Sequence, residues 1–272
     1  MSICESDKLT LALGQMASTY ASTDNFAIAN AFLEESRARG ADLIIFPENV
    51  LCRGSYDDIR NESHSEDFYI EKLGRLSKKF GVNVVWGGIP VRYPEGLFNV
   101  AMVFDYSGQL LAAYRKIHLF RLNLGYKSVD EGSLFESGSI PVKFQLGNWS
   151  IGLTICYDLR FPELFRTYAG VDLILCPADF TYFTGKAHWD VLLRARAIEN
   201  QCFVAGVNQC GLNKTMNVKS NGHSQVVDPW GTHLVSSKDQ EMCILCDLDR
   251  KRLENVRTQL PALSSIAHRI TW

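Results

Sequence analysis

The sequence predicts an α/β protein of mixed β-sheets covered by helices, folded as a single domain over residues 1–272. Three observations support this prediction. Segments with strand and helix patterns alternate along the chain. Two segments, 97–116 and 222–235, have the pattern of β-hairpins. The runs DLIIF (42–46) and DLILC (172–176) are apolar on both faces, which is typical of inner strands in a covered sheet.

Apolar periodicity and the positions of glycine and proline place the individual elements. Short apolar runs bounded by turn residues predict strands at 8–16, 41–47, 82–90, 149–156, 171–178, 202–210 and 241–249. Patterns that repeat with the helical period predict helices at 24–40, 66–81, 161–170 and 188–201. Asp24 is expected to cap the first helix, and Gly40 and Gly81 to end the first two.

Charge and composition exclude several classes of partner. The formal net charge is −2, and Lys and Arg are scattered along the chain, so we expect no nucleic acid or anionic membrane as partner. The start of the chain lacks the basic and apolar regions of a signal peptide. We therefore expect a cytoplasmic protein.

The chain has eight cysteines, which are expected to be free thiols in a reducing compartment. Cys243 and Cys246 form a C-x-x-C pair that could indicate a redox protein with a reversible disulfide. They lie within a predicted strand, where residues three apart point to opposite faces, so we expect no disulfide between them. A structural role is also expected for Cys4, Cys52, Cys176, Cys202 and Cys210.

Three reactive side chains follow predicted strands. Glu48 lies just beyond 41–47, Lys116 ends the hairpin, and Cys156 ends the strand in LTICYDLRFPELF. Ligands of α/β sheets bind beyond the carboxyl ends of strands, so we expect these side chains to converge. Cys156 suits a nucleophile whose thiolate is stabilised by a helix start. Glu48 suits a general base, and Lys116 suits stabilising an oxyanion together with the backbone N–H of Tyr157.

The stretches FPEN, YRKIHLF and CYDLRFPELFR resemble the three catalytic motifs of the nitrilase superfamily, the carbon–nitrogen hydrolases. Further stretches, GKAHWDVLLRARAIENQCFVAGVNQCG and GHSQVVDPWGT, resemble the Nit-type amidases within it. This resemblance runs from about Leu9 to Pro261. It implies a four-layer α-β-β-α sandwich and a Glu–Lys–Cys triad of Glu48, Lys116 and Cys156.

The resemblance also implies the reaction. A small-molecule amide is hydrolysed through a cysteine thioester with release of ammonia, with no metal or organic cofactor, and the chain pairs into a homodimer. Many members carry a second glutamate in an F-x-E-S stretch, which here suggests Glu136 as a fourth catalytic residue. The segment 120–133 departs from the family pattern just before this stretch. Glu131 and Asp130 are the other nearby carboxylates that could take this role.

Residues around these motifs could line a substrate pocket. The candidates lie on predicted loops or follow the nucleophile: Tyr56, Arg160, Phe180, Tyr182, Phe183 and His188. We interpret Asp158, Arg160 and Glu163 first as a polar network that holds the turn after Cys156. A contact between Arg160 and a substrate carboxylate is the alternative. His118 and His188 are expected to be structural or pocket-lining residues.

The sequence does not decide between two classes of substrate. The resemblance suggests deaminated glutathione or an ω-amide of a keto acid, such as α-ketoglutaramate or α-ketosuccinamate. A nitrilase or carbamoylase of the same superfamily is an alternative enzyme. A catalytically silent scaffold that binds a metabolite is an alternative from another class, although the three candidate catalytic residues argue against it.

Overall fold

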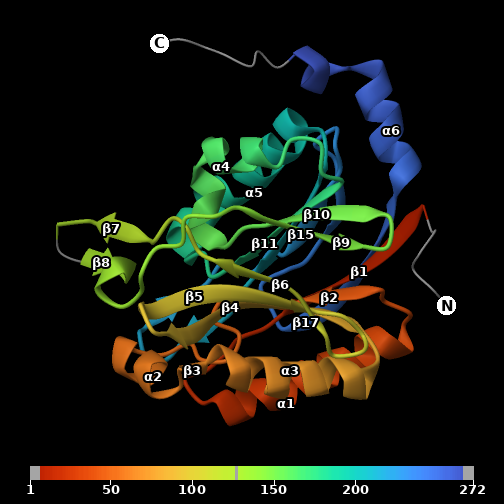
Figure 1. The fold of residues 1–272 in the computed structure, drawn as a ribbon. Coiled ribbons are helices and arrows are strands. Elements are labelled where there is room, and N and C mark those ends of the chain that lie inside the picture. Colours follow the sequence, from red (N-terminus) through yellow and green to blue (C-terminus); the bar gives the residue numbers. More distant parts are fainter. Residues whose placement is uncertain (1–6, 126–127, 266–272) are drawn as a thin grey trace.

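The computed structural model describes residues 7–125 and 128–265 and confirms the four-layer α-β-β-α sandwich (Figure 1). Two mixed β-sheets pack face to face, and helices cover the outer face of each. Within the described residues, no helix is long and apolar enough to cross a membrane. Of the eight cysteines, Cys4 lies outside the described residues.

The first sheet has seven strands, with β3 paired to β4 beside the path β17-β1-β2-β4-β5-β6. Its strands are β1 (Lys8–Gln15), β2 (Leu43–Ile45), β3 (His64–Ser65), β4 (Asn83–Tyr93), β5 (Gly96–Phe104), β6 (Leu110–Arg115) and β17 (Met242–Asp249). Strands β1, β2 and β4 are parallel, whereas β17, β5 and β6 add antiparallel pairs. The hairpin predicted at 97–116 is confirmed as β5 and β6.

The second sheet follows the order β16-β15-β12-β11-β10-β9. Its strands are β9 (Val142–Leu146), β10 (Trp149–Leu153), β11 (Leu173–Ala178), β12 (Phe203–Asn208), β15 (Gln225–Val227) and β16 (His233–Ser236). The three central strands are parallel and the outer pairs are antiparallel. Two short ribbons stand apart, β7 (Arg121–Asn123) with β8 (Ser128–Asp130) and β13 (Leu212–Asn213) with β14 (Val218–Lys219).

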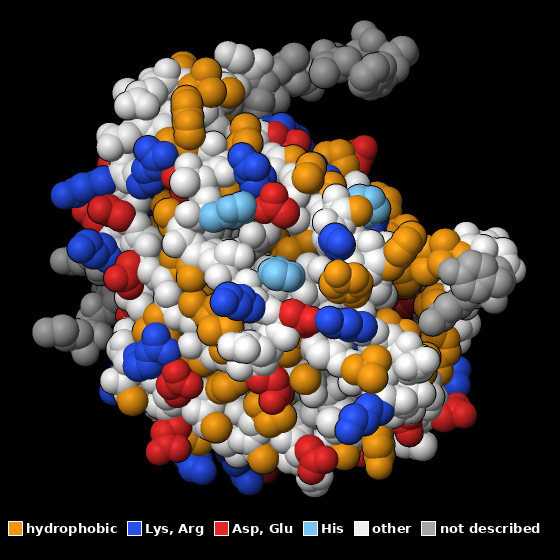
Figure 2. All heavy atoms as spheres, turned by 180° about the vertical axis from the view of Figure 1, so that it is seen from behind, with side chains coloured by type: hydrophobic (Ala, Val, Ile, Leu, Met, Phe, Trp, Pro, Cys, Tyr) orange, Lys and Arg blue, Asp and Glu red, His pale blue; other side chains and the backbone are white. Residues whose placement is uncertain are grey.

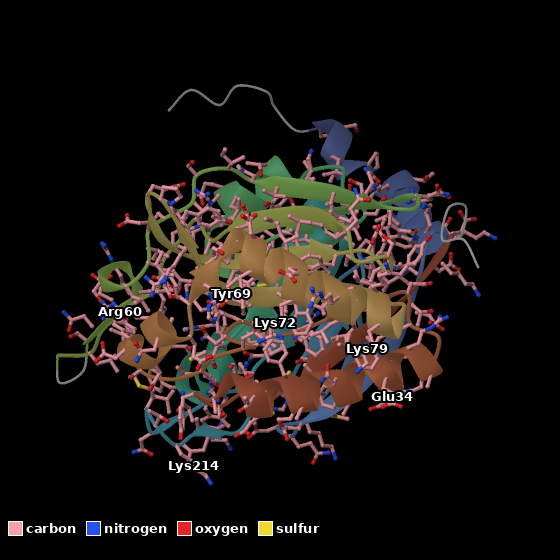
Figure 3. The ribbon with its side chains drawn as sticks, turned by 60° about the horizontal axis from the view of Figure 1, so that its bottom comes forward. Glu34, Arg60, Tyr69, Lys72, Lys79 and Lys214 are labelled. Atoms are coloured by element: carbon pink, nitrogen blue, oxygen red, sulfur yellow. The ribbon has the colours of Figure 1, made fainter. Side chains whose placement is uncertain are left out.

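Six α-helices lie in the described part of the chain. They are α1 (Ser22–Ala38), α2 (Tyr56–Asn61), α3 (Glu66–Phe80), α4 (Pro162–Thr167), α5 (Tyr182–Asn200) and α6 (Arg250–Gln259). Figure 3 shows α1 and α3 side by side over the first sheet, with the charged ends of Lys72 and Lys79 directed outward. Helices α4 and α5 cover the second sheet (Figure 1).

Most predicted helix positions are confirmed, and the differences have local causes. The α3 helix begins after Ser65, whose side chain accepts from the Phe68 N–H, and ends at Gly81, which adopts a left-handed φ of 63°. Helix α1 begins at Ser22 instead, so Asp24 lies in its first turn and is not the N-cap. Helix α5 begins six residues before the predicted start because Thr181 caps it.

The two larger clusters of the core lie on opposite sides of the first sheet, and a small third cluster contains Cys52, Ile59 and Phe135. Along β1, Leu11 and Leu13 face the second sheet, whereas Ala12 faces the helices, as strand alternation requires. The same alternation separates Cys243 and Cys246, which join different clusters on opposite sides of β17. Both are free thiols, and the prediction that they point to opposite faces of the strand is confirmed.

Candidate active site

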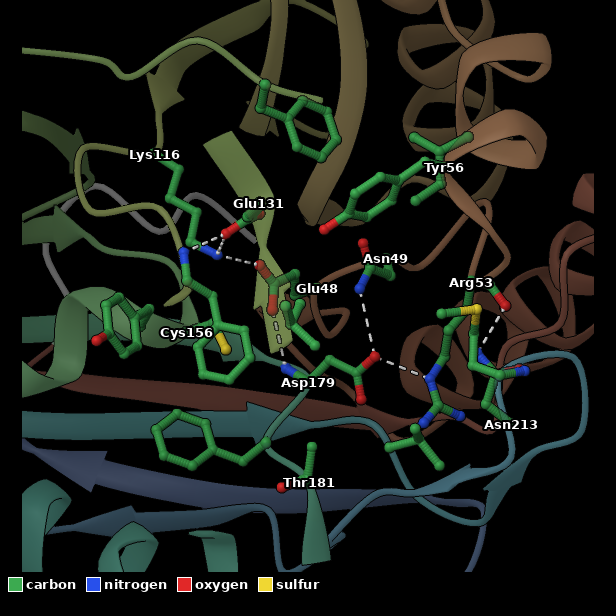
Figure 4. Close-up of a pocket in the computed structure, with 18 of the residues that line it drawn as sticks. Glu48, Asn49, Arg53, Tyr56, Lys116, Glu131, Cys156, Asp179, Thr181 and Asn213 are labelled. Atoms are coloured by element: carbon green, nitrogen blue, oxygen red, sulfur yellow. Dashed lines mark hydrogen bonds and ion pairs between the residues drawn. The ribbon is translucent and has the colours of Figure 1, made fainter. Parts of the chain in front are cut away.

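Three strand ends from two sheets meet in one pocket of about 200 Å³ (Figure 4). Glu48 lies three residues after β2, and Lys116 directly follows β6, both in the first sheet. Cys156 opens a 3-10 helix, η3 (Cys156–Arg160), that follows β10 of the second sheet. All three side chains line the pocket, so the predicted convergence is confirmed.

Lys116 lies between two carboxylates. Its Nζ is 2.7 Å from Glu48 Oε1 and 2.7 Å from Glu131 Oε2, and only 2% of the residue is exposed. Burial alone would lower the pKa of Lys116, but the negative charges of Glu131 and Glu48 outweigh it and raise the pKa well above the usual 10.5. Lys116 is therefore a fixed positive charge that cannot act as a base at neutral pH.

Glu131, and not Glu136, is the second glutamate at Lys116, so the prediction for Glu136 is wrong. Glu136 is exposed, and its backbone N–H donates to the Leu97 carbonyl. The β7–β8 ribbon doubles the chain back, and a short 3-10 helix, η2 (Glu131–Ser133), follows it. This return brings Glu131 against Phe120, whose N–H donates to Glu131 Oε2 at 2.7 Å. The segment that departs from the family pattern thus carries the second carboxylate that binds Lys116.

We predict that Glu131→Gln lowers kcat for the amide hydrolysis expected from the sequence motifs on the order of a hundredfold or more, because Lys116 then loses one of its two counter-charges. Glu136→Gln, the matched control five positions along the chain, leaves kcat unchanged because that side chain is exposed. Steady-state ammonia release measures both variants. The assignment of Glu131 is wrong if the two substitutions have equal effects.

Cys156 has a strained backbone at the turn from strand to helix. Its φ is 48°, which a non-glycine residue adopts at a cost of about 1–3 kcal/mol. Burial, followed by the charge of Glu48, raises the pKa of the Cys156 thiol well above its usual value of 9.0. The start of the short η3 turn therefore does not lower the pKa of this thiol enough to offset burial. The resting group is a thiol that needs a base.

Glu48 is placed to be that base. Burial raises the pKa of Glu48 from its usual 4.5, and the charge of Lys116 partly offsets this increase. Its Oε1 accepts from the Asn99 amide at 2.9 Å, and its Oε2 accepts from the Asp179 N–H at 3.1 Å. The Gln209 amide donates to the Glu48 carbonyl at 2.9 Å, so the backbone is held as well.

A buried carboxylate braces the turn that carries Cys156. Asp158 is fully buried and accepts from the Ile155 N–H, the Tyr114 hydroxyl and the His118 N–H at 2.8, 2.7 and 3.0 Å. The His118 ring also contacts Asp158 and stacks on Phe161. The structural interpretation of Asp158 and His118 is confirmed. Glu163 is exposed on α4 and takes no part in this network in the described structure.

Aromatic side chains form much of the pocket wall. Of the predicted pocket residues, Tyr56, Arg160 and Phe180 line it, as does Tyr157, the predicted oxyanion donor. Tyr182, Phe183 and His188 do not, because α5 begins at Tyr182 and turns their side chains to the exposed surface. In the described part of the chain, His188 contacts the site through Arg160, at 3.2 Å. Among the described residues, no group of three His, Cys, Asp or Glu side chains could hold a metal ion.

One buried ion pair in the wall was missed by the sequence analysis. Asp179 follows β11, and its carboxylate accepts from Arg53 Nε at 2.8 Å and from Asn49 at 3.3 Å (Figure 4). Ser220 bridges both partners. Asp179 is a charged residue directly beyond a buried strand, which is the same signal that identified Glu48. Arg53 lies in a loop without a comparable pattern.

Comparisons with known proteins agree with this geometry. The profile of the carbon–nitrogen hydrolase family matches residues 10–258. A deaminated glutathione amidase of Synechocystis sp. is 34% identical over 269 residues, which cover 94% of this chain and 96% of the relative. The human omega-amidase NIT2 is 35% identical over 261 residues, which cover 92% of each chain.

The fold comparison gives the same result. The crystal structure of Nit3 from Saccharomyces cerevisiae, described as a member of branch 10 of the nitrilase superfamily, superposes with a TM-score of 0.85. Sequence identity is 28%, and the match covers 96% of this chain and 97% of that one. The chain therefore belongs to the carbon–nitrogen hydrolase family.

Proposed function

We propose that the protein hydrolyses a small carboxylate-bearing amide to an acid and ammonia, through a thioester on Cys156. The observation that carries this proposal is the buried Lys116, bonded to Glu48 and Glu131 at 2.7 Å each, beside a buried thiol. A permanent cation, a carboxylate base and a protonated nucleophile together supply what acyl transfer from an amide requires.

In the first half of the reaction, Glu48 takes the thiol proton while the Cys156 sulfur attacks the amide carbonyl carbon. The oxygen of the tetrahedral intermediate gains a negative charge, which the Lys116 ammonium and the Tyr157 N–H stabilise. Glu48 then returns the proton to the amide nitrogen. The C–N bond breaks, ammonia leaves, and the acyl group remains on sulfur as a thioester.

In the second half, a water molecule replaces ammonia. Glu48 removes a proton from this water, the oxygen attacks the thioester carbonyl, and the second tetrahedral intermediate uses the same two donors. The C–S bond breaks, and the sulfur regains its proton from Glu48. Glu131 transfers no proton in either half of the reaction; its carboxylate holds Lys116 and accepts the Phe120 N–H.

The position of Arg160 is an argument that the substrate carries a carboxylate. It lines the pocket four residues after the nucleophile, and within the described residues no carboxylate lies within 4 Å of its guanidinium. Its neighbours are the faces of Tyr157 and Phe180, at 5.7 and 5.3 Å, and the His188 ring. A guanidinium without an acidic partner favours an anionic group of the ligand.

An ammonia-release screen tests this proposal. We expect turnover of ω-amides of keto acids or of deaminated glutathione, and faster turnover of glutaramic acid than of pentanamide, its uncharged counterpart. Arg160→Met should raise KM for the charged amides by roughly 10- to 100-fold, the value of a charge-assisted hydrogen bond, and leave pentanamide unaffected. Arg166→Met, an exposed arginine on α4, is the control. No ammonia from any amide would refute the proposal.

We further propose that the enzyme is a homodimer in the cytosol. Helix α5 exposes Phe183, Val191 and Ile198, which are 73%, 64% and 47% exposed and share one face of the helix. A second copy of the chain would remove this apolar stripe from water. The seven cysteines in the described residues are free thiols, which suits a reducing compartment.

A further inference from the structure

Asn99 on β5 bridges the two glutamates of the site from outside the pocket lining. Its Nδ2 donates to Glu48 Oε1 at 2.9 Å and to Glu131 Oε1 at 3.0 Å. Its carbonyl also accepts from the Lys116 N–H at 2.8 Å, so one residue holds all three charged groups. Asn99 is 2% exposed and does not line the pocket, so it touches the base and not the substrate.

The other end of the Asn99 amide is left without a partner. Its Oδ1 is buried and accepts no hydrogen bond in the described structure. It points toward Gly88, where an added Cβ would lie 2.9 Å from Oδ1 and 2.6 Å from Glu48 Cγ. A buried acceptor without a donor costs stability, so packing of the strand gives no reason for an amide at this position. The two hydrogen bonds that its NH₂ group donates to Glu48 and Glu131 do give a reason.

The two carboxylates need this donor because they share a small buried volume. Glu131 has three donors, which are Lys116, Asn99 and the Phe120 N–H. Glu48 has Lys116, Asn99, the weaker Asp179 N–H at 3.1 Å and the Cys156 thiol. N–H donors favour the ionised form of a carboxyl group, whereas burial and a second carboxylate oppose it. Losing Asn99 therefore removes one N–H donor from each carboxylate, and leaves Glu48 with Lys116, the Asp179 N–H and the Cys156 thiol.

We propose that Asn99 is a positioning residue that keeps Glu48 ionised, and therefore able to accept the Cys156 proton, by donating to both glutamates at once. This inference rests on the proposed amide hydrolysis. The charged or titratable groups that face Glu48 are Lys116 after β6, Glu131 in η2, Cys156 in η3 and Asp179 after β11. Asp179 directs its carboxylate to Arg53. Replacing Asn99 changes none of these charges.

The test compares Asn99→Ala with Asn83→Ala. Asn83 is also 2% exposed and lies on β4 of the same sheet, but its amide donates to the Asp42 carbonyl away from the pocket. Two profiles are measured against pH: kcat/KM, and the rate at which iodoacetamide alkylates Cys156, located by peptide mass spectrometry. The second profile reports the Cys156–Glu48 pair without turnover.

We expect Asn99→Ala to lower kcat/KM at neutral pH by roughly 10- to 100-fold, the range of a general-base contribution. Its acidic limb should move to higher pH by about one unit, because Glu48 loses a donor, and the activity should partly recover as the pH rises. The alkylation profile should move in the same direction. Asn83→Ala should leave both profiles in place.

Profiles of Asn99→Ala that keep the wild-type limbs would overturn the inference, even if kcat falls, because a purely structural role changes rate without shifting titration. Should the alanine variant fail to fold, Asn99→Leu fills the strand with an apolar side chain and faces the same criterion. Failure of the wild-type protein to release ammonia would refute the proposed function alone, since the alkylation profiles still test Asn99.

Discussion

Replacing Cys156 by alanine abolishes ammonia release, with kcat reduced by at least about 10⁴-fold on the best amide of the screen. The side chain is small and lines an existing pocket, so we expect the fold to survive the loss of one sulfur atom. Intact-mass measurement after rapid mixing should show an acyl adduct on the wild-type chain and none on Cys156→Ala. Together the two measurements separate loss of the nucleophile from loss of the fold.

The matched control is Cys176→Ala. Cys176 also lies in an apolar strand of the second sheet and is fully buried, and burial raises the pKa of its thiol to about 12. It does not line the pocket. We expect this variant to keep its activity and to form the adduct. Ammonia release that persists in Cys156→Ala at the wild-type rate would rule out the thioester route.

The layered fold was predictable because the sequence marks where each inner strand begins and ends. The inner strands are apolar on both faces and end at charged or turn residues, so β2 and β11 could be located from the sequence. Helix α6 was not predicted, because its sequence RKRLENVRTQ is largely polar and only Leu253 and Val256 are buried. The early start of α5 was missed because Thr181 acts as N-cap within a run that looks like a loop.

The site was predictable where the chemistry lies at a strand end and unpredictable where it depends on a loop. Glu48, Lys116 and Cys156 follow strands, and sheet topology alone brings them together. Glu131 depends on the return of the β7–β8 ribbon, which spacing in the sequence does not report, and the alternative carboxylate Glu136 is only five residues away. In the sequence, Asn99 is one polar residue inside an apolar strand. Its place between the two glutamates is visible only from its hydrogen bonds.

The second large effect concerns Glu48. Glu48→Gln keeps the size and the acceptor oxygen of the side chain but cannot take a proton, so acylation of Cys156 should stop. We expect kcat to fall by at least about a thousandfold while cooperative thermal unfolding is retained. Glu163→Gln, an exposed carboxylate on α4, is the control and should behave as wild type. Rapid-quench mass spectrometry measures the acyl adduct in each variant.

The pH profile of the wild-type enzyme tests the same assignment with no substitution. Burial raises the pKa of Glu48 above 4.5, and below that raised pKa the carboxyl group is protonated and cannot accept the thiol proton. Activity should therefore rise with pH through the Glu48 pKa. Lys116 has a pKa well above 10.5 and stays charged across this range, so it contributes no limb near neutrality.

An adduct that forms at the wild-type rate in Glu48→Gln would mean that another group takes the proton. Lys116 is held charged between two carboxylates and cannot be that group, so Glu131, the second carboxylate bonded to Lys116, is the next candidate, and Glu131→Gln would then become the deciding variant.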